Sequence, residues 1–391
     1  MTTDTAATNE AVIVGAVRTP IGRRQGNLIT WRPDDLFAHL LKALVERTGI
    51  STESIQEVLV GCVMQVGEQA LNIARKAVLT ADFPEGVSAT TVDYQCGSGL
   101  RAVQIAAAQI QAGISEIVVA GGVESMTRVP LGATGQTYGD PLSPTLRSRY
   151  DLVSNGVSSD LIAKRWNLSR KESDELSLRS HELAWRATQE GRFADEIVPV
   201  PIPGEGRTVL MDRDEGIRPE TSLDKLATLR TVFTPDGPTT AASSSQISDG
   251  AAAMLIMSAR RAGELGLSPL ARVGPQVAVG TDPVLGLTGP IDATRLVLKR
   301  QSWTIDDIDL FEINEAFAPV ILAWQRELQP DMSRVNVNGG AIALGHPLGC
   351  SGARLVTTLV HEMRRRESRR GLVSLCCNAG LGIGLVVEAA S

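Results

Sequence analysis

The order of apolar and polar positions along the chain predicts alternating strands and helices. Short continuous apolar runs are typical of buried strands, and apolar residues three and four positions apart are typical of amphipathic helices. In the first third of the chain the expected elements are a strand over residues 10–20, a helix over 34–50, a short helix and a strand over 51–63, a further helix, a strand over 89–95, a helix from Ser98 and a strand over 115–126.

The same order of elements returns from about residue 270. The best local match sets SGLRAV (98–103) against SGARLV (351–356). Repetition of one order predicts two βα-rich halves of one architecture, each a mixed sheet with helices on both faces. The second series comprises a strand over 271–280, a helix over 292–303, a short helix and strand over 304–317, a helix over 318–328, a strand, loop and helix over 334–363, and paired strands over 371–388.

The middle of the chain differs in composition from the two repeated series of elements. Gly, Pro, Ser and Thr interrupt two helical stretches, over residues 158–168 and 170–191. This segment cannot supply a missing half-repeat, so we interpret it as an insertion whose loops lie over one face, where loops commonly bind ligands. The predicted domains are an N-terminal half (1–123 plus 250–269), an inserted loop domain (124–249) and a C-terminal half (270–391).

The composition narrows the class of protein. With 391 residues, 43% hydrophobic and 21% charged, the chain can bury a large core. A net charge of −6 disfavours nucleic acid as a partner, and the basic run over residues 364–371 is expected to be a solvated helix end. No apolar run reaches the ~18 residues of a membrane helix, so no membrane insertion is expected.

The cysteines and the N-terminus bear on the compartment. The first ten residues are polar and lack an apolar core, which favours a disordered leader over a signal or transit peptide. Five cysteines without an export signal favour free thiols and a cytoplasmic location. Neither Cys-x-x-Cys nor His-x-x-x-His spacing occurs, and no metal site is expected.

Cys96 stands between an alternating strand and Gly97-Ser98-Gly99, which open a helix. Free backbone N–H groups and the helix dipole at such a turn favour the thiolate, which is the nucleophilic form. The small residues leave room for a substrate to approach the sulfur. The alternative is a buried structural cysteine, although such a residue more typically stands within a strand, as Cys62 does.

His346 lies in the loop NGGAIALGHPLGCSG, three residues before Gly349, which pairs with Cys96 in the repeat. Pseudo-symmetry is therefore expected to bring Cys96 and His346 to one cleft, where the imidazole can accept the thiol proton. A loop histidine without chemistry is the alternative. The other three histidines (39, 181 and 361) sit in amphipathic patterns and are expected at the surface.

Two further positions complete the candidate constellation. Asn314, at the end of an apolar strand, can hold a water or a developing oxyanion, or it can simply cap the next helix. Cys376 ends a strand at a loop of small residues. Two thiols and a histidine suit carbon–carbon bond chemistry on a thioester, in which one thiol holds an acyl group while the other moves a proton.

Five motifs in order resemble those of the thiolases. They are QCGSGLRAV, GGVESMTR, NEAFA, NGGAIALGHPLGCSGAR and LCCNAGLGIG, and the resemblance spans residues 10–390. It implies a thiolase-like α/β fold, in which two pseudo-symmetric βαβαβαββ halves stack as a five-layer αβαβα sandwich with an inserted loop domain.

The resemblance also implies roles for individual residues. Cys96 matches the nucleophile that becomes acylated, and His346 matches the base that activates it and faces the thioester oxygen of the second substrate. Asn314 matches the residue that holds the water of the first oxyanion hole. Cys376 matches the acid/base that deprotonates acetyl-CoA or protonates its enolate. The backbone N–H groups of Cys96 and Asn378 match the second oxyanion hole.

Substrate contacts and partners follow from the same resemblance. Ser245 matches a pantetheine contact, Arg218 a contact to the nucleotide end and Phe317 a wall of the acyl pocket. The substrates implied are acyl-CoA, acetyl-CoA and CoA, with no permanently bound cofactor and no metal. A homodimer or homotetramer is implied as well.

Two departures from the family pattern bear on these roles. Thiolases usually have TAGNASG where this chain has TAASSSQ (residues 240–246), beside the pantetheine arm. The terminal Cys-x-Gly-Gly-Gly is here CCNAG, so Ala379 is strained if its position needs a positive φ. Strand alternation directs Cys376 and Cys377 to opposite faces, so only one should reach the site, and the motif favours Cys376.

Two further features of the sequence bear on the substrate range. Short-chain biosynthetic thiolases typically have His-Met-Gly where this chain has Ser154-Asn155-Gly156, and GHPLGCSGAR leans toward degradative enzymes. The leading hypothesis is therefore a degradative or broad 3-ketoacyl-CoA thiolase that works by ping-pong transfer through acyl-Cys96. The alternatives are a biosynthetic acetyl-CoA C-acetyltransferase, a ketoacyl-synthase-like decarboxylative condensing enzyme, and a CoA-ester-binding subunit without turnover.

Overall fold

The first half of the chain follows the predicted order of elements. The computed structural model describes residues 9–135 and 139–390, so most of the predicted leader lies outside the described residues. The first-half elements are β1 (Ala11–Arg18), β2 (Gly22–Arg23), α2 (Pro33–Thr48), β3 (Glu57–Gly61), α3 (Ile73–Thr80), β4 (Ser88–Val92), α4 (Ser98–Gln111), β5 (Ile117–Ser125), β8 (Ser248–Ser258) and α9 (Ala259–Glu264).

The second half repeats this order with one element missing. The strand expected at the start of residues 334–363 is not formed, and only a single bridge joins Phe311 and Val335. Asn336 turns to φ 47, and its side chain pairs with both the N–H and the C=O of Ile313 in place of a continued strand. The elements are β9 (Ala271–Gly280), α10 (Gly289–Gln301), β10 (Leu310–Ile313), α11 (Ala318–Leu328), α12 (Ala341–Leu344), α13 (Leu348–Arg366), β11 (Arg370–Cys377) and β12 (Leu381–Ala389).

Hydrogen bonds link the strands in the order β10-β11-β12-β9-β1-β8-β5-β3-β4, with β2 attached to β8. Within this path β3 pairs in parallel with β4 and β5, and β10 pairs in parallel with β11, whereas the other pairs are antiparallel. β1 and β9 share only two residue pairs, Val12 with Arg272 and Ile13 with Ala271. The two expected mixed sheets therefore meet along one short seam.

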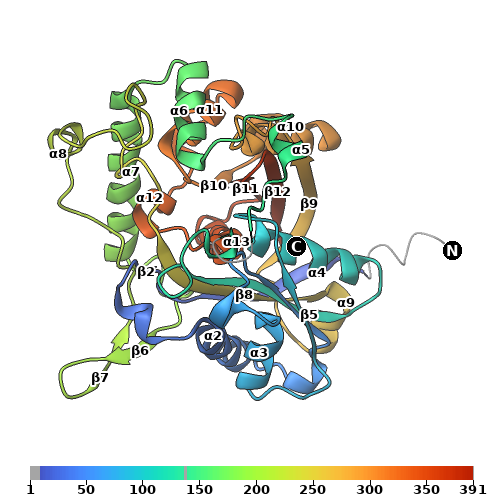
Figure 1. Ribbon diagram of the computed structural model, residues 1–391. Coiled ribbons are helices and arrows are strands. Elements are labelled where there is room, and N and C mark those ends of the chain that lie inside the picture. The colour runs from blue at the N-terminus through green and yellow to red at the C-terminus, as the bar shows by residue number, and fades with distance from the viewer. Residues whose placement is uncertain (1–8, 136–138, 391) are drawn as a thin grey trace.

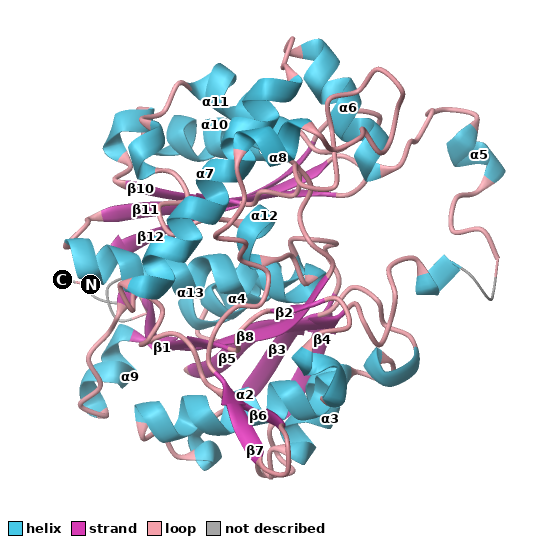
Figure 2. Cartoon of the chain, turned by 90° about the vertical axis from the view of Figure 1, so that its left-hand side faces the viewer, coloured by secondary structure: helices cyan, strands magenta, loops and turns pink. Residues whose placement is uncertain are grey.

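Helices and sheets alternate in five layers (Figures 1 and 2). α2 and α3 cover the outer face of the first sheet, α4 and α13 lie between the two sheets, and α10 and α11 cover the second sheet. A Cβ on Gly99 would lie 2.9 Å from the N atom of Ala353, and one on Gly352 would lie 2.3 Å from that of Leu100. Glycine at these matched positions thus lets the N-terminal turns of α4 and α13 touch.

The inserted segment contains more regular structure than loops alone. Its elements are α5 (Pro144–Arg147), α6 (Asn155–Arg165), α7 (Arg170–Gln189), β6 (Val200–Pro203), β7 (Thr208–Met211) and α8 (Leu223–Ala227). A capping box of Ser169 and Glu172 begins α7. α6 and α7 pack against α11, and α7 also contacts α12, so these two helices lie beside the second half, whereas β6 and β7 pack against the core of the first half (Figure 1). Within the described ranges, no helix combines the length and apolar character needed to cross a membrane.

Candidate active site

Cys96 lies in a tight turn that begins α4. Gln95 adopts φ 51, and the hydroxyl of Ser98 closes the turn by accepting from Tyr94 N (2.8 Å) and donating to Gln95 O (2.6 Å). The backbone N–H groups of Cys96 and Asn378 both point at the sulfur of Cys96. The strand–turn–helix expected from the sequence is therefore present, and donors from both halves of the chain converge on this thiol.

Burial of Cys96 changes the pKa of its thiol more than these two N–H donors do. The side chain is only 5% exposed, and loss of solvent raises the pKa of its thiol to about 12, whereas the two N–H groups act in the opposite direction. The expectation of a depressed pKa at the helix N-terminus is therefore wrong for the substrate-free chain. Because the thiol is protonated at rest, a base has to remove its proton when it attacks.

His346 is held in one tautomer by Ser351. The hydroxyl of Ser351 donates to Pro347 O (2.8 Å), so its oxygen is left to accept from the Nδ1–H of His346 (2.6 Å). The Nε2 atom of His346 is then unprotonated and lies 3.4 Å from the amide nitrogen of Asn314. This arrangement leaves an imidazole lone pair available as a proton acceptor.

The surroundings of His346 favour its neutral form. Burial lowers the pKa of His346 to about 3, and the positive charge of Arg354 acts in the same direction. Arg354 forms a buried ion pair with Glu312 (3.3 Å), and Glu312 precedes Asn314 by two residues in the chain. Burial also raises the pKa of Glu312, to about 8, despite the Arg354 charge. A neutral imidazole is the form that can accept a proton from a thiol.

Asn314 does not cap a helix. The N-cap of α11 is Phe317, which makes no side-chain cap, so the capping alternative for Asn314 is wrong. The side chain of Asn314 is fully buried, and its Oδ1 has no hydrogen-bond partner among the described residues. An orphaned buried acceptor beside His346 fits a bound water. The neighbouring Glu315 instead accepts from Ser180 (2.6 Å), which ties the insertion to this loop.

The two adjacent thiols at the end of β11 point to opposite faces of the sheet, as strand alternation predicts. Cys377 packs with Ile383 toward the central helices, and a Cβ on Gly97 would lie 2.7 Å from its sulfur. Cys376 packs on the face of Ile313 and Phe317. Burial raises the pKa of both thiols, and the charge of a Cys96 thiolate would raise each of them further.

An apolar cluster surrounds the sulfur of Cys96. Its other buried members come from the loops after β3 and after β5 and from the first turn of α13, and no member bears a charge. Leu348, two residues after His346, belongs to the cluster and brings the His346 segment against Cys96. The surface next to the Cys96 sulfur thus suits an aliphatic group. The buried members besides Cys96 are Val63, Met64, Met126, Val129 and Leu348.

The residues predicted to contact CoA lie on loops of the insertion and of the second half. Ser245 is half-buried, and its N–H donates to Ala316 O (2.9 Å), so the altered TAASSSQ segment pairs with the NEAFA segment. Phe317 stacks edge-to-face on Phe233, with ring centroids 5.8 Å apart. In the same segment the buried Ser243 hydroxyl accepts from Thr240 N (2.8 Å).

Arg218 is exposed, and its backbone N–H donates to Nδ1 of His181 (3.1 Å). His181 is therefore buried, and its expected place at the surface is wrong because the insertion folds over α7. His39 and His361 are half-buried and contact backbone carbonyls of Pro199 and Ala16.

Sequence reasoning missed several residues that shape the site. Ser351 lies within the SGARLV repeat match and Arg354 within the quoted GCSGAR run, but no sequence pattern shows that they face His346. Gln246 replaces the last Gly of TAGNASG, and its amide donates to the carbonyls of Gly216 and Ile342, both at 2.9 Å. This departure therefore adds a link between the insertion and α12.

Ala379 adopts φ 62, so the position does require the left-handed conformation that glycine provides elsewhere in the family motif. Replacing Ala379 with Gly is expected to raise the free energy of unfolding by up to ~1 kcal/mol, because the left-handed region costs an L-residue ~1–2 kcal/mol and glycine's unfolded-state entropy offsets part of that gain. Urea denaturation of both proteins measures the difference.

The reciprocal control for this prediction is Gly380→Ala. Gly380 has φ 75, and a Cβ there would lie 2.7 Å from Thr281 O, so this variant should be less stable than the parent protein. A loss of stability in Ala379→Gly would contradict the assignment of strain to Ala379.

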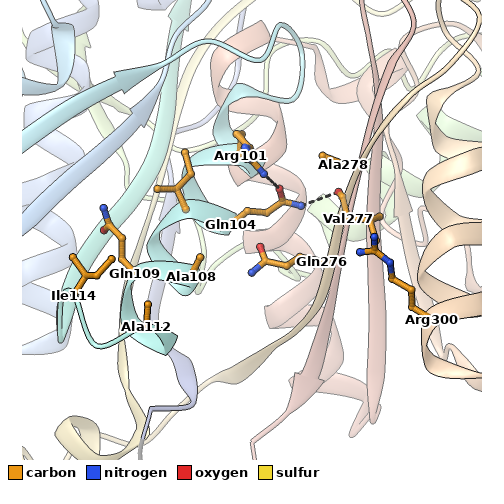
Figure 3. A pocket seen from close by; sticks show the side chains of 11 residues that line it. Arg101, Gln104, Ala108, Gln109, Ala112, Ile114, Gln276, Val277, Ala278 and Arg300 are labelled. Atoms are coloured by element: carbon orange, nitrogen blue, oxygen red, sulfur yellow. Dashed lines mark hydrogen bonds between the residues drawn. The ribbon is translucent and has the colours of Figure 1, made fainter. Parts of the chain in front are cut away.

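A nearby hollow is separate from this constellation. A cavity of about 420 Å³ lies between α4 and β9. Arg101, Gln104 and Gln276 point into it (Figure 3). Arg101 donates to the side-chain Oε1 of Gln104 (2.9 Å), and the Nε2 of Gln104 donates to Val277 O (3.1 Å). None of the predicted site residues lines this cavity. In the described part of the chain, no group of three or more His, Cys, Asp or Glu side chains is arranged to hold a metal ion.

Comparisons with known proteins agree with the fold and with the motifs. The family model described as "Thiolase, N-terminal domain" matches residues 11–260, and "Thiolase, C-terminal domain" matches residues 267–389. The chain is 43% identical to an acetyl-CoA acetyltransferase of Chromobacterium violaceum (97% of this chain, 99% of that protein). It is 44% identical to a steroid 3-ketoacyl-CoA thiolase of Mycobacterium tuberculosis (98% and 95%).

A solved structure adds a three-dimensional comparison. The crystal structure of the Bacillus anthracis acetyl-CoA acetyltransferase matches with a TM-score of 0.91 and 39% identity, covering 98% of this chain and all of that one. The predicted family and fold are thereby confirmed. The chain belongs to the thiolase family and is an acyltransferase that acts on CoA thioesters.

Proposed function

We propose that this thiolase cleaves 3-ketoacyl-CoA with CoA, reversibly and by ping-pong transfer through an acyl-Cys96 intermediate. The observation that supports this most directly is the convergence on one sulfur of N–H groups from Cys96 and Asn378, with a neutral His346 on the adjoining segment. Two N–H groups so placed can hold the oxygen of a carbonyl that the sulfur attacks.

In the first half-reaction, the sulfur of Cys96 attacks the 3-keto carbon and its proton passes to Nε2 of His346. The bond between C2 and C3 then breaks, and its electron pair leaves with acetyl-CoA as the enolate. Cys376 donates its proton to C2 and becomes a thiolate. The N–H groups of Cys96 and Asn378 hold the 3-keto oxygen, while His346 and a water on Asn314 face the thioester oxygen.

In the second half-reaction, the thiol of free CoA attacks the acyl group on Cys96. The Cys376 thiolate takes the proton of this thiol, and the departing Cys96 sulfur regains its proton from His346. Both sulfurs and the imidazole return to their resting state, so every proton is accounted for. Run backwards, the same steps join two acyl-CoA molecules in a Claisen condensation.

We place Ser245, Arg218 and Phe317 around the CoA substrate, at the pantetheine arm, the nucleotide end and the acyl group in turn. The acyl group itself would lie on the uncharged cluster around Cys96, which contains two flexible methionines. A degradative or broad substrate range is favoured by this surface and by Asn155 in place of a methionine. Strict synthesis of acetoacetyl-CoA is the alternative, and one relative is named an acetyl-CoA acetyltransferase.

The second thiol disfavours one of the other two alternatives, and the fixed tautomer of His346 disfavours the other. A decarboxylative condensing enzyme has no use for an acid/base cysteine such as Cys376, and a binding subunit without turnover has no need of a base held in one tautomer.

The partners and compartment are part of the same proposal. β4 is an edge strand that pairs with no further strand of the described residues on its outer side, and it leads directly into the Cys96 turn. Pairing of two copies along β4 would cover that edge and support a homodimer, or a homotetramer built from two. The five buried free thiols suit the reducing cytoplasm.

Thiolysis of a series of 3-ketoacyl-CoAs, from four carbons upward and including a branched one, tests this function. Addition of CoA is expected to remove the 3-ketoacyl-CoA absorbance for several chain lengths. Activity on four carbons alone would favour the acetyltransferase. Binding without turnover would indicate the non-enzymatic subunit, and release of CO2 from malonyl-CoA would indicate the condensing enzyme.

A further inference from the structure

Glu124, in β5, has a fully buried side chain that accepts four hydrogen bonds from N–H groups and a longer one from the Cys62 thiol (3.9 Å). Its Oε2 accepts from the backbone N–H groups of Val63 (2.9 Å) and Gly349 (2.9 Å). Its Oε1 accepts from the N–H of Met64 (3.1 Å) and from the amide of Gln69 (2.6 Å). All four donors are neutral, so backbone and amide dipoles replace the water that a carboxylate has in solution.

One oxygen of this carboxylate joins the two halves of the protein. Val63 belongs to the loop after β3 in the first half, whereas Gly349 belongs to the first turn of α13 in the second half. The two segments come this close because glycines line the contact. A Cβ on Gly122 would lie 1.9 Å from Gly349 O, and one on Gly61 would lie 2.8 Å from the same atom.

Both segments that Glu124 holds lie beside the proposed chemistry. Val63 and Met64 line the apolar cluster around Cys96. Gly349 follows His346 by three residues, on the turn that begins α13. A shift of either segment would therefore change the position of the imidazole relative to the sulfur.

Only a carboxylate suits this set of donors. Each of its two oxygens accepts two hydrogen bonds from N–H groups, whereas the amide of a glutamine would offer one oxygen and turn an NH2 group against two N–H donors. The N-terminal turn of α13 also favours a negative charge at Gly349 N. Shortening the side chain to Asp would leave the carboxylate unable to reach both segments.

We propose that Glu124 is a positioning residue for acyl transfer, which holds the loop of Val63 and Met64 and the first turn of α13 at the spacing that Cys96 and His346 need. This inference rests on the proposed function. Glu124 itself touches no reacting atom and acts through the segments that it holds.

The test compares Glu124→Gln with Glu362→Gln. Glu362 is also buried and on α13, but it accepts from Asn338 and Arg365, far along the helix from His346. In Glu124→Gln, kcat for thiolysis is expected to fall roughly 100-fold, because small misplacements of reacting groups have effects of that size, while KM for CoA stays within about threefold. In Glu362→Gln both constants should stay within about threefold.

Circular dichroism establishes that each variant is folded before the kinetic comparison. A folded Glu124→Gln with the kcat of the parent protein, or an equal loss in Glu362→Gln, would overturn the inference. If the Gln variant does not fold, Glu124→Asp and Gln69→Met take its place, and a kcat equal to that of the parent in either one would overturn it. An inactive parent protein would instead refute the proposed function.

Discussion

Replacing Cys96 with Ala is expected to lower the rate of thiolysis by roughly 10⁴-fold or more, since removal of a covalent nucleophile leaves only binding and oxyanion stabilisation. The sulfur is the group on which the N–H groups of Cys96 and Asn378 converge, and no other thiol has that arrangement among the residues the structure describes. Thiolysis under single-turnover conditions measures the loss directly.

Labelling provides a second measurement of the same prediction. Iodoacetamide followed by peptide mass mapping should modify Cys96 before the other four cysteines, and acetyl-CoA should protect it. Cys350→Ala is the matched control, because Cys350 is also buried and burial raises its pKa to about 12, but it has no place in the proposed steps. Preferential labelling of another cysteine, or an active Cys96→Ala enzyme, would contradict the assignment.

Replacing Cys376 is expected to have the second large effect on activity, whereas replacing its neighbour Cys377 is expected to have a small one. Cys376→Ala is expected to lower thiolysis by roughly 10³-fold, within the range of general acid–base catalysis, because the enolate then has no positioned proton donor. Cys377→Ala should keep activity within about threefold and lower the free energy of unfolding by ~1 kcal/mol, because it removes a buried sulfur that packs against Gly97 and Ile383.

Hydrogen exchange separates these two thiols further. In D2O, the parent protein and Cys377→Ala should incorporate deuterium at C2 of acetyl-CoA, as measured by mass spectrometry, whereas Cys376→Ala should not. Loss of exchange in Cys377→Ala with retention in Cys376→Ala would reverse the two roles. Urea denaturation of both variants shows whether a rate loss has a structural origin instead.

The sequence predicted the arrangement of the fold because hydrophobic periodicity directly reports which faces of strands and helices are buried. The strands of 271–280 and the helix of 318–328 have the predicted bounds. The prediction of a strand near Val335 is wrong because the side chain of Asn336 takes the place of the backbone pairing. A pattern of apolar residues does not reveal such a side-chain contact.

The site was predictable at the residues that motifs mark, and less so where tertiary packing decides the chemistry. The predicted direction of the Cys96 pKa shift is wrong because it considers the helix N-terminus alone. The rest of the chain excludes solvent from the thiol, and this raises the pKa. His181 was misplaced for a similar reason, since its partner Arg218 lies in a separate loop. The hydrogen bond between His346 and Ser351 depends on the direction of a helical turn, which the sequence pattern does not reveal.

The contact between the first turns of α4 and α13 has a consequence for the origin of such an enzyme. One turn follows Cys96 and the other follows His346, so each half of the chain contributes one member of the proposed acid–base pair. A single-half ancestor could have assembled such an acid–base pair only by facing a duplicate of itself. In that lineage, self-association would have preceded catalysis, and gene fusion would later have freed each copy to specialise.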